Sequence, residues 1–512
     1  DMQNNDKKVL LRISNLKQYF PLKGGRFVKA NDGISLDIYE GETFGLVGES
    51  GCGKSTLGRT ILQLYHQTYG RTMYYGRSLD DLAPKYVIET VRNLKSRRTK
   101  LRELEQKRDK LEAEYAKLSE KEQYAKHTEL DTARKLAEDA LLDITKIVGG
   151  FLVVDDLDPV IAAYSKDYAI ARKLSSMEEK RQELQVDVDD AEYAKKTAEE
   201  AGKSAKDGQL QKAQEKLKQC DDQIASLRTQ LEEGRKEIEA LRAPYANDPE
   251  FQKYEAYRDD GIDLARLEYN EMRRLRRDMQ LIFQDPYSSL NPRMSVGQII
   301  SEGMQAHNMI KKKDARMQEM VLKIMDDCGL APYFLHRFPH QFSGGQRQRI
   351  GIARALATKP KFVVCDEAVS ALDVSIQAQI INLLLDLKEQ QNLTYMFITH
   401  DLSVVKYISD RVGVMYLGTM VELAAADEIF HHPIHPYTEA LLNAIPTTDT
   451  VGAKELSILE GDIPSPVNPP KGCKFHTRCK YCTEICTQVV PEWEEVRPNH
   501  FVACHHKLEV KE

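Results

Sequence analysis

The spacing of apolar residues changes repeatedly along this chain of 512 residues. Over about 9–79, short apolar runs alternate with glycines, a pattern typical of buried strands and turns. Over about 81–261, Lys, Glu, Ala, Leu, Gln and Arg dominate, and Gly and Pro are almost absent from two long stretches. The mixed pattern returns near residue 263, and a segment rich in Pro and Cys follows residue 442. We expect an α/β domain interrupted by a helical insertion and followed by an irregular extension.

The insertion carries two heptad patterns, in which apolar residues occupy the first and fourth of every seven positions. The weaker pattern runs over 94–118 and has Arg97 and Arg108 on its apolar seam. Between the two patterns lies the segment 147–156, which is too short for a domain and suits a turn. These features predict one antiparallel coiled-coil hairpin over 81–262, with this segment at its tip. The stronger pattern consists of Leu210, Ala213, Leu217, Cys220, Ile224, Leu227, Leu231, Ile238 and Leu241.

The segment 48–56 has the pattern of a phosphate-binding loop, which is Gly, four residues and then Gly-Lys-Ser. It follows an apolar run, 43–47, that predicts a buried strand, and this is the setting the motif requires. Glycines let backbone N–H groups converge on phosphates, Lys54 supplies a cation, and the Ser55 hydroxyl can ligate Mg²⁺. The residues expected to bind ATP here are Ser50, Gly51, Cys52, Gly53, Lys54, Ser55 and Thr56.

Two carboxylates, Asp366 and Glu367, follow another apolar run at 362–365. Asp366 is predicted to hold Mg²⁺ through water, and Glu367 to polarise the water that attacks the γ-phosphate. A strand that ends in Asp-Glu is a weak signal alone, but it is specific when paired with a phosphate loop.

A Ser-Gly-Gly turn at 343–345 precedes a predicted helix at 350–356 and offers free N–H groups and a favourable helix dipole to an anion. With this turn, the order of motifs resembles the ATPase subunit of an ATP-binding cassette (ABC) protein. The resemblance implies an α/β fold of the P-loop NTPase class with a helical subdomain. It also implies a head-to-tail ATPase dimer, in which the signature loop completes the partner's nucleotide site. That loop would comprise Ser343, Gly344, Gly345 and Gln346, with Phe342 in place of the commoner Leu.

The resemblance assigns further roles. Phe20, with Tyr19 as the alternative, would stack on adenine, and Asp373 would belong to the D-loop. Gln284 would sense Mg²⁺ and the γ-phosphate, and His400 would be the switch histidine. The implied catalytic residues are thus Lys54, Gln284, Glu367 and His400, and the implied Mg²⁺ ligands are Ser55, Gln284 and Asp366.

Three segments, 283–294, 435–438 and 472–479, resemble the F-type ATPase subunit of bacterial oligopeptide and dipeptide importers. The resemblance covers everything except the insertion. It implies ATP-driven peptide import with a second, D-type ATPase subunit, two membrane permease subunits and an extracytoplasmic peptide-binding protein. It also implies a peripheral position on the cytoplasmic face of the bacterial membrane. The expected domains are 1–80 and 263–430 for the split ATPase core, 81–262 for the insertion and 431–512 for the extension.

Composition adds two expectations. Lys and Arg total 73 against 79 Asp and Glu, so the net charge of −6 gives no electrostatic reason to expect a nucleic-acid partner. No run approaches the roughly 18 apolar residues that span a bilayer, and 1–6 lacks the pattern of a secretory signal. We expect a soluble cytosolic chain that contacts the membrane only through permeases.

Cysteines gather near the end of the sequence, which favours a metal site over a disulfide framework in a cytosolic chain. Four thiolates suit a [4Fe–4S] cluster or tetrahedral Zn²⁺, and reduced thiols without a ligand remain open. The resemblance places the iron–sulfur cluster first. His476 and His505 could substitute as ligands, and Cys482 is an extra cysteine. The four cysteines that match the spacing of the importer family are Cys473, Cys479, Cys486 and Cys504.

Two alternatives concern the insertion. Chromosome-maintenance and DNA-repair ATPases also combine an ABC-type ATPase with long coiled coils, but as known for that family their coiled coil follows the Q-loop. Here Gln284 comes after the insertion, whose only cysteine is Cys220, so the Cys-x-x-Cys of a zinc hook is missing. Within the importer interpretation, the insertion is either a solvated hairpin tolerated at a surface turn or an arm that contacts a partner.

Overall fold

The computed structural model describes residues 7–202, 207–311, 316–444 and 461–508. Residues 1–6, where the sequence shows no secretory pattern, lie outside this part. The chain forms two compact units, each built from separate stretches of sequence. The first unit comprises 1–73, 273–307 and 318–512, and the second comprises 74–272 and 308–317.

An eight-stranded sheet forms the centre of the first unit, with the order β11-β12-β10-β9-β3-β8-β7-β6. Strand β3 pairs in parallel with both β8 and β9, and β7 pairs in parallel with β6 and β8. Every residue of β3, β7 and β8 is buried, as the continuous apolar runs of a parallel sheet covered on both faces require. The strands are β3 (Thr43–Val47), β6 (Met279–Ile282), β7 (Phe362–Asp366), β8 (Thr394–Ile398), β9 (Arg411–Tyr416), β10 (Thr419–Ala425), β11 (Glu494–Arg497) and β12 (His500–Val502).

Strands from the C-terminal extension complete this sheet. Strand β12 pairs antiparallel with β10, and β11 pairs antiparallel with β12. The extension is therefore joined to the rest of the large sheet by main-chain hydrogen bonds. A separate four-stranded sheet has the order β2-β1-β4-β5, in which β1 and β2 are antiparallel. Its strands are β1 (Val9–Pro21), β2 (Phe27–Tyr39), β4 (Tyr69–Tyr74) and β5 (Ile262–Asp263).

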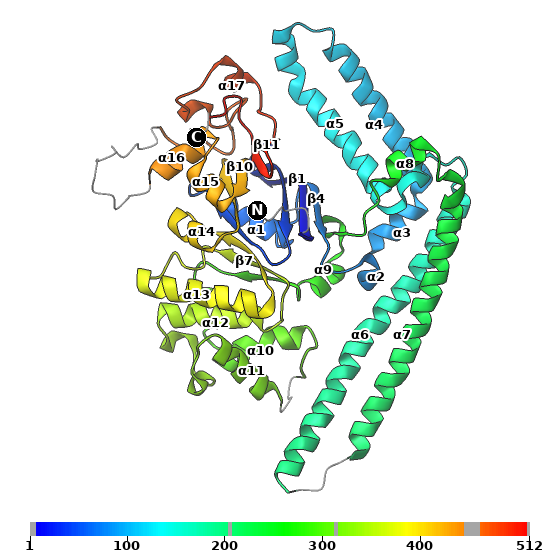
Figure 1. The fold of residues 1–512 in the computed structure, drawn as a ribbon, viewed down its shortest axis with the longest axis vertical. Helices are drawn as coiled ribbons and strands as arrows, with labels where there is room; N and C mark the ends of the chain where they lie inside the picture. The colour runs from blue at the N-terminus through cyan, green and yellow to red at the C-terminus, as the bar shows by residue number, and fades with distance from the viewer. Residues whose placement is uncertain (1–6, 203–206, 312–315, 445–460, 509–512) are drawn as a thin grey trace. The chain divides into compact units, whose positions relative to one another are not determined.

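Helices α1, α12 and α14 pack against strands of the large sheet, and α10 packs on α12 (Figure 1). The described helices outside residues 74–272 are α1 (Lys54–Ile61), α10 (Val296–Ala306), α11 (Arg316–Asp327), α12 (Gly344–Leu356), α13 (Val374–Gln391), α14 (Leu402–Ile408), α15 (Ala426–His431), α16 (Pro436–Asn443) and α17 (Glu484–Gln488). Short 3₁₀ turns occur at η5 (Pro332–Phe334), η6 (Pro339–Gln341) and η7 (His476–Arg478).

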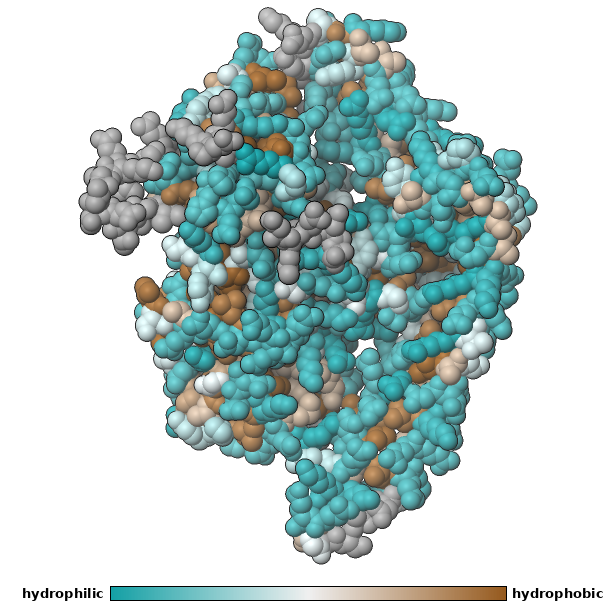
Figure 2. Space-filling view, in the orientation of Figure 1, coloured by the Kyte–Doolittle hydropathy of each residue, from teal (hydrophilic) through white to brown (hydrophobic). Residues whose placement is uncertain are grey.

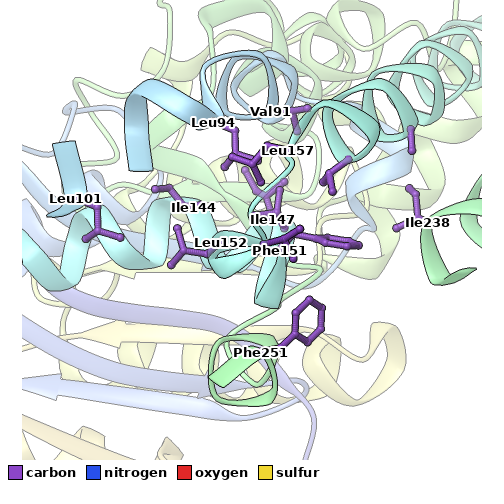
Figure 3. Packing of buried hydrophobic residues seen from close by; sticks show 14 of the residues in the cluster. Val91, Leu94, Leu101, Ile144, Ile147, Phe151, Leu152, Leu157, Ile238 and Phe251 are labelled. Atoms are coloured by element: carbon purple, nitrogen blue, oxygen red, sulfur yellow. The ribbon is translucent and has the colours of Figure 1, made fainter. Parts of the chain in front are cut away.

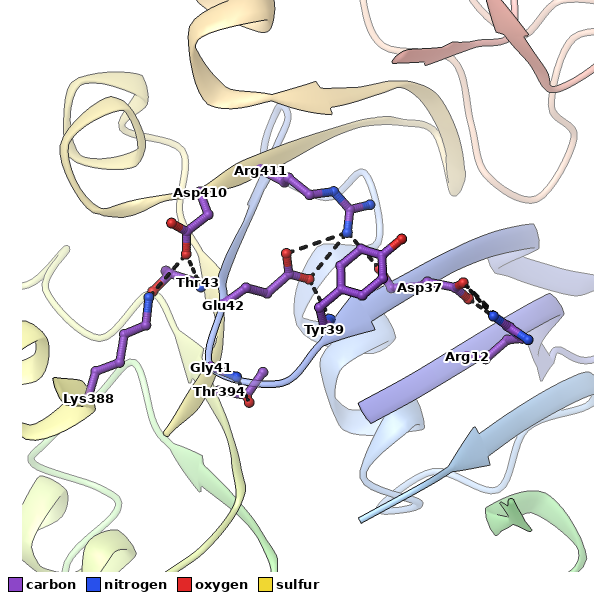
Figure 4. Close-up of polar contacts among 10 residues, drawn as sticks. All are labelled: Arg12, Asp37, Tyr39, Gly41, Glu42, Thr43, Lys388, Thr394, Asp410 and Arg411. Atoms are coloured by element: carbon purple, nitrogen blue, oxygen red, sulfur yellow. Dashed lines mark hydrogen bonds and ion pairs between the residues drawn. The ribbon is translucent and has the colours of Figure 1, made fainter. Parts of the chain in front are cut away.

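A group of polar contacts holds the start of β3 in place (Figure 4). Arg411 of β9 donates to the Glu42 carboxylate at 3.3 Å and to the Asp37 carbonyl at 3.1 Å. The Thr43 N–H donates to Asp410 at 2.7 Å, and Lys388 donates to the same carboxylate oxygen at 3.1 Å. Because Glu42 and Arg411 are both buried, each needs the other to offset its loss of water. These contacts fix the strand that leads into the phosphate loop.

The second unit differs from the single hairpin expected over 81–262. Helix α4 pairs with α5, and α6 pairs with α7, so the insertion holds two helix pairs that diverge from the segment that contains α8 (Figure 1). The sequence interpretation treated the two heptad segments as partners, whereas each pairs with a long helix adjacent to it in sequence. The elements are α2 (Leu79–Leu82), α3 (Lys85–Arg92), α4 (Leu94–Tyr115), α5 (Glu120–Val148), η2 (Gly149–Val153), α6 (Asp158–Glu200), α7 (Asp207–Arg242), η3 (Ala243–Tyr245), α8 (Pro249–Glu255), η4 (Leu264–Arg266) and α9 (Tyr269–Leu275).

The segment expected at the tip, 147–156, lies instead at the junction of the two helix pairs (Figure 3). Phe151 is fully buried and meets Phe251 of α8 edge-on, with ring centroids 5.6 Å apart. A Cβ on Gly150 would come within 2.5 Å of the Phe251 ring, so glycine is what allows this approach. The expectation that this segment forms the tip was wrong. Burying its apolar side chains is favourable, whereas a solvated tip would leave them exposed to water.

The second helix pair is held by an apolar seam. Ala171 and Leu174 of α6 pack with Cys220, Ile224 and Leu231 of α7. Figure 2 shows hydrophilic residues over most of this pair, with apolar residues gathered along the line where the two helices meet. The buried face of α7 thus follows the stronger heptad pattern. Across the described stretches of the chain, no helix is both long and apolar enough to cross a membrane.

Candidate nucleotide site

The candidate phosphate loop lies between β3 and α1, and its shape depends on glycine. Gly53 is the N-cap of α1 and has a φ of 84°, in the left-handed region. A Cβ at this position would lie 2.0 Å from the Ala30 carbonyl oxygen, so no other residue fits without moving the backbone. The Asn31 side chain donates to the Gly53 carbonyl at 2.7 Å. Strand β2 therefore fixes the point at which the loop enters the helix.

Lys54 is buried, and its ammonium group lies inside the loop. Its Nζ atom donates to the Gly48 carbonyl at 2.9 Å and to the Glu49 carbonyl at 3.4 Å. The cation thus lies within the loop that the sequence assigns to phosphate binding. The neighbouring Cys52 thiol is also buried, and burial raises its pKa to about 11. That thiol stays protonated at neutral pH and acts as a small apolar side chain.

Two of the three residues expected to hold Mg²⁺, Ser55 and Asp366, meet directly. The Ser55 hydroxyl donates to Oδ1 of Asp366 at 2.5 Å. Arg59 donates to Oδ2 of the same carboxylate at 3.1 Å. Asp366 is fully buried, so both partners offset the loss of water around its charge. Sequence analysis did not single out Arg59, although it lies four residues after Ser55 and hence on the same helix face.

Three expected catalytic residues converge at the end of β7. Gln284 donates from Nε2 to Oε2 of Glu367 at 2.5 Å, and His400 Nδ1 lies 3.4 Å from Oε1. Glu367 has a φ of 48°, which is unusual for a residue with a side chain. Its N–H donates to the Ile398 carbonyl of β8 at 2.9 Å, which holds the backbone in this conformation. Gln284 and His400, from two other stretches of sequence, therefore contact the two oxygens of the Glu367 carboxylate.

The signature turn and the D-loop each begin a helix. Ser343 is the N-cap of α12, and its hydroxyl accepts from the Gln346 N–H at 3.4 Å. Gln346 accepts in return from the Ser343 N–H at 3.2 Å, which completes a capping box. Asp373 caps α13 by accepting from the Ile376 N–H at 3.1 Å. The N-terminus of α12, which we expect to face an anion, is thus capped by the side chains of Ser343 and Gln346.

The two candidates for the adenine-stacking residue lie in different environments. The Tyr19 hydroxyl donates to Asp32 at 2.5 Å, and burial together with this carboxylate raises the pKa of Tyr19. Phe20 meets the Tyr65 ring edge-on, with centroids 5.3 Å apart. The hydrogen bond to Asp32 holds the Tyr19 side chain in place, whereas Phe20 has no polar atom that needs a partner. This difference favours Phe20 as the residue that stacks on adenine.

The predicted metal cluster in the extension is not supported. Within the parts of the chain that the structure describes, no three His, Cys, Asp or Glu side chains are placed to hold a metal ion together. Burial raises the pKa of Cys473 to about 12 and of Cys504 to about 11. Cys504 donates to the His506 carbonyl at 3.1 Å. The Cys486 Sγ atom lies 3.7 Å from the Thr483 hydroxyl.

The histidines considered as substitute ligands also have other partners. Nδ1 of His476 lies 2.8 Å from the Cys473 carbonyl, and Nε2 of His505 lies 2.9 Å from the Val489 carbonyl. The spacing of the cysteines alone therefore did not suffice to predict a metal centre that the described residues support.

The loop at Lys54, the buried parallel sheet and the carboxylates at the end of β7 define a P-loop nucleotide-binding protein. Residues 31–252 and 252–370 match the ABC transporter family. Residues 421–486 match a second family, described as the C-terminal region of oligopeptide/dipeptide transporters. The chain belongs to the ABC transporter family. It is an ATPase subunit of the ABC type, for which ATP and Mg²⁺ are the expected ligands.

Named relatives extend the comparison. The oligopeptide transport ATP-binding protein AppF of Bacillus subtilis is 52% identical over 250 residues, which are 48% of this chain and 75% of AppF. A putative peptide import ATP-binding protein of Brucella ovis is 54% identical over 245 residues, covering 48% of this chain and 77% of the relative. The putative oligopeptide transport ATP-binding protein YkfD of Bacillus subtilis is 34% identical over 498 residues, covering 97% and 95%. Because this last alignment covers nearly the whole chain, it extends through the insertion.

Proposed function

We propose that this chain binds and hydrolyses ATP to power the import of oligopeptides or dipeptides through a membrane permease. The match of residues 421–486 to the C-terminal region of oligopeptide/dipeptide transporters carries this proposal. The printed names of the relatives, which describe peptide import or oligopeptide transport, support it. The matched region begins in β10, which pairs antiparallel with β9, so main-chain hydrogen bonds tie this region to the large sheet.

Each residue around the loop has a proposed task. Lys54 and the loop N–H groups bind the β- and γ-phosphates. Ser55 and Asp366, which already contact each other, would hold Mg²⁺ together with Gln284, and the ion would supply positive charge beside the phosphates. Glu367 orients the attacking water and takes up its proton. Gln284 and His400 keep the Glu367 carboxylate directed toward that water, which their present contacts with both of its oxygens support.

The signature turn of this chain would contact the nucleotide bound by a second subunit. The capping box leaves Ser343 and Gln346 at an exposed helix start, as a surface that meets a partner's nucleotide requires. We therefore infer a head-to-tail dimer with a D-type ATPase subunit. The assembly would include two permease subunits and an extracytoplasmic peptide-binding protein. The chain would lie at the cytoplasmic face of the bacterial membrane.

For the insertion we propose a coiled coil formed by α6 and α7. Support comes from the buried face of α7, where Ile224, Leu231 and Ile238 recur every seven residues. Such a seam needs few apolar residues, so the remaining surface can be highly charged. A hairpin that returns to its starting point can be accommodated between two parts of the ATPase core without separating them.

Reconstitution tests the transport proposal. The chain would be purified with its genomic neighbours, placed in proteoliposomes with the binding protein, and supplied with ATP and a labelled peptide library. We expect peptide uptake that depends on ATP and is lost when the Glu367→Gln variant replaces the chain. Absence of integral membrane partners, together with an ATPase rate that rises on adding DNA, would instead support the chromosome-maintenance alternative.

A further inference from the structure

The C-terminal extension reaches the phosphate loop through one arginine. Arg478, at the end of η7, donates from Nη1 to Oε2 of Glu49 at 2.7 Å and from Nη2 to Oε1 at 3.1 Å. Glu49 is the second residue of the loop, directly after Gly48. The Arg478 side chain is only 4% exposed and that of Glu49 is 23% exposed. A bidentate pair of this kind fixes both the position and the orientation of the carboxylate.

A second residue of the same region holds the backbone of Glu49. The Tyr437 hydroxyl accepts from the Glu49 N–H at 3.0 Å, and the Tyr437 side chain is fully buried. Phe475 packs beside it, with the Tyr437 ring centroid 5.2 Å away. Main chain and side chain of Glu49 are therefore both fixed by residues that follow the ATPase motifs in sequence.

The extension also reaches the other end of the loop. Lys474 donates to the Leu417 carbonyl at 3.0 Å, in the turn between β9 and β10. The next residue, Gly418, donates its N–H to the Cys52 carbonyl at 2.8 Å. The loop is thus supported at residues 49 and 52, on either side of the glycine at 51.

We propose that Arg478 is a positioning residue for the phosphate loop: it neutralises Glu49 and holds it away from the phosphates, so the extension sets the affinity for ATP. A carboxylate at this place would repel a triphosphate bound one or two residues further along the loop. Arg478 removes that repulsion without contacting the nucleotide. The proposal rests on ATP binding by this chain and not on the solute transported, so it stands or falls independently of peptide uptake.

The test measures binding of radiolabelled MgATP to the full-length chain by equilibrium dialysis, with both the Kd and the number of sites determined. We expect Arg478→Gln to raise the Kd about tenfold at an unchanged number of sites, because the Glu49 charge would then be unneutralised beside the bound phosphates. The double variant Arg478→Gln with Glu49→Gln should recover most of the affinity, since the unneutralised charge is gone. An affinity in the double variant as weak as in Arg478→Gln would overturn the proposal.

A matched control comes from the same segment. Lys480 forms an ion pair with Glu439 at 2.9 Å and is 62% exposed, so Lys480→Gln removes a salt bridge near Arg478 without reaching the loop. We expect a wild-type Kd for this variant. A purely structural role for Arg478 would lower the number of sites and kcat but leave the Kd and KM of the folded fraction unchanged, which would also overturn the proposal.

A conservative variant covers the case in which Arg478→Gln does not fold. Arg478→Lys keeps the positive charge but cannot donate in the same two-point geometry. We expect its Kd and its KM for ATP to rise about threefold, with kcat unchanged, because the loop is less well positioned in ground and transition states alike. A wild-type Kd and KM in Arg478→Lys would overturn the proposed positioning role.

Discussion

Gln284 and Glu367 lie 83 residues apart in sequence, yet the amide nitrogen of one is 2.5 Å from a carboxylate oxygen of the other. His400 approaches the second oxygen of the same carboxylate. Glu367 is therefore held from two sides by residues on different segments. This arrangement directs the carboxylate, as a residue that orients a water molecule requires.

Replacing Glu367 with Gln tests its role in hydrolysis. Gln keeps the size and the hydrogen bonds of the side chain but cannot accept a proton, so turnover should fall by at least about a hundredfold. ATP binding should persist, and the closed ATPase dimer should become more stable because bound ATP is no longer hydrolysed. Phosphate release and nucleotide retention measure the two effects. As a control, Glu389→Gln, on the exposed face of α13, should leave turnover unchanged. Normal turnover in Glu367→Gln would remove this residue from catalysis.

Gly53→Ala tests the shape of the phosphate loop. Its Cβ would lie 2.0 Å from the Ala30 carbonyl oxygen, so the loop must move, and ATP affinity should fall by about a hundredfold or more. Gly24→Ala is the matched control, because Gly24 has a φ of 79° but nothing within 4 Å of its Cβ position. That variant should lose about 1 kcal/mol of stability from backbone strain and keep its ATP affinity. Equal affinities for the two variants would contradict the importance of this contact.

The junction of the two helix pairs should depend on Phe251. This side chain is 1% exposed and contacts Phe151, so Phe251→Ala should lower the free energy of unfolding of the second unit by about 3–5 kcal/mol. Thermal melts followed by far-UV circular dichroism suit this unit, because it is almost entirely helical. Leu136→Ala on α5 is the control: the side chain is 42% exposed, and its loss should change stability by no more than about 0.5 kcal/mol. Similar melts for both variants would argue against the junction as the core of this unit.

His435 predicts a dependence of stability on pH. Burial lowers its pKa to about 4 from an ordinary value of 6.5, and its buried Nε2 atom has no hydrogen-bond partner among the described residues. Between these pH values the unfolded chain binds the proton more readily than the folded chain does. The free energy of unfolding is therefore unaffected by His435 protonation above about pH 6.5. It falls by about 3 kcal/mol in total as the pH decreases toward 4, because the unfolded chain then binds the proton.

His435→Asn isolates this effect, because Asn can still accept from the Tyr437 N–H that His435 caps at 3.0 Å. Urea unfolding followed by the fluorescence of Trp493, the only tryptophan, should show a shallower rise in stability from pH 4 to 6.5. His340→Asn, at an exposed position, should keep the wild-type slope. An unchanged slope in His435→Asn would show that other groups account for the pH dependence.

How far prediction from sequence succeeded depends on the range of the contacts involved. The phosphate loop at Lys54 and the carboxylates at 366–367 follow local patterns, a buried strand followed by a polar turn, that are visible within about ten residues. The seam of α7 could also be predicted, because heptad spacing is a property of one helix. The pairing of that helix could not, since a seam does not identify its partner among three other long helices.

By itself, the sequence determined the class of nucleotide site and the face that α7 buries, because both depend on residue types at short, fixed spacings. Only the tertiary structure decided that 147–156 is a buried junction and that Arg478 reaches Glu49 across 429 residues. Such contacts are set by how whole elements pack. No local pattern records them, because the free energy that selects them is gained only when distant segments meet.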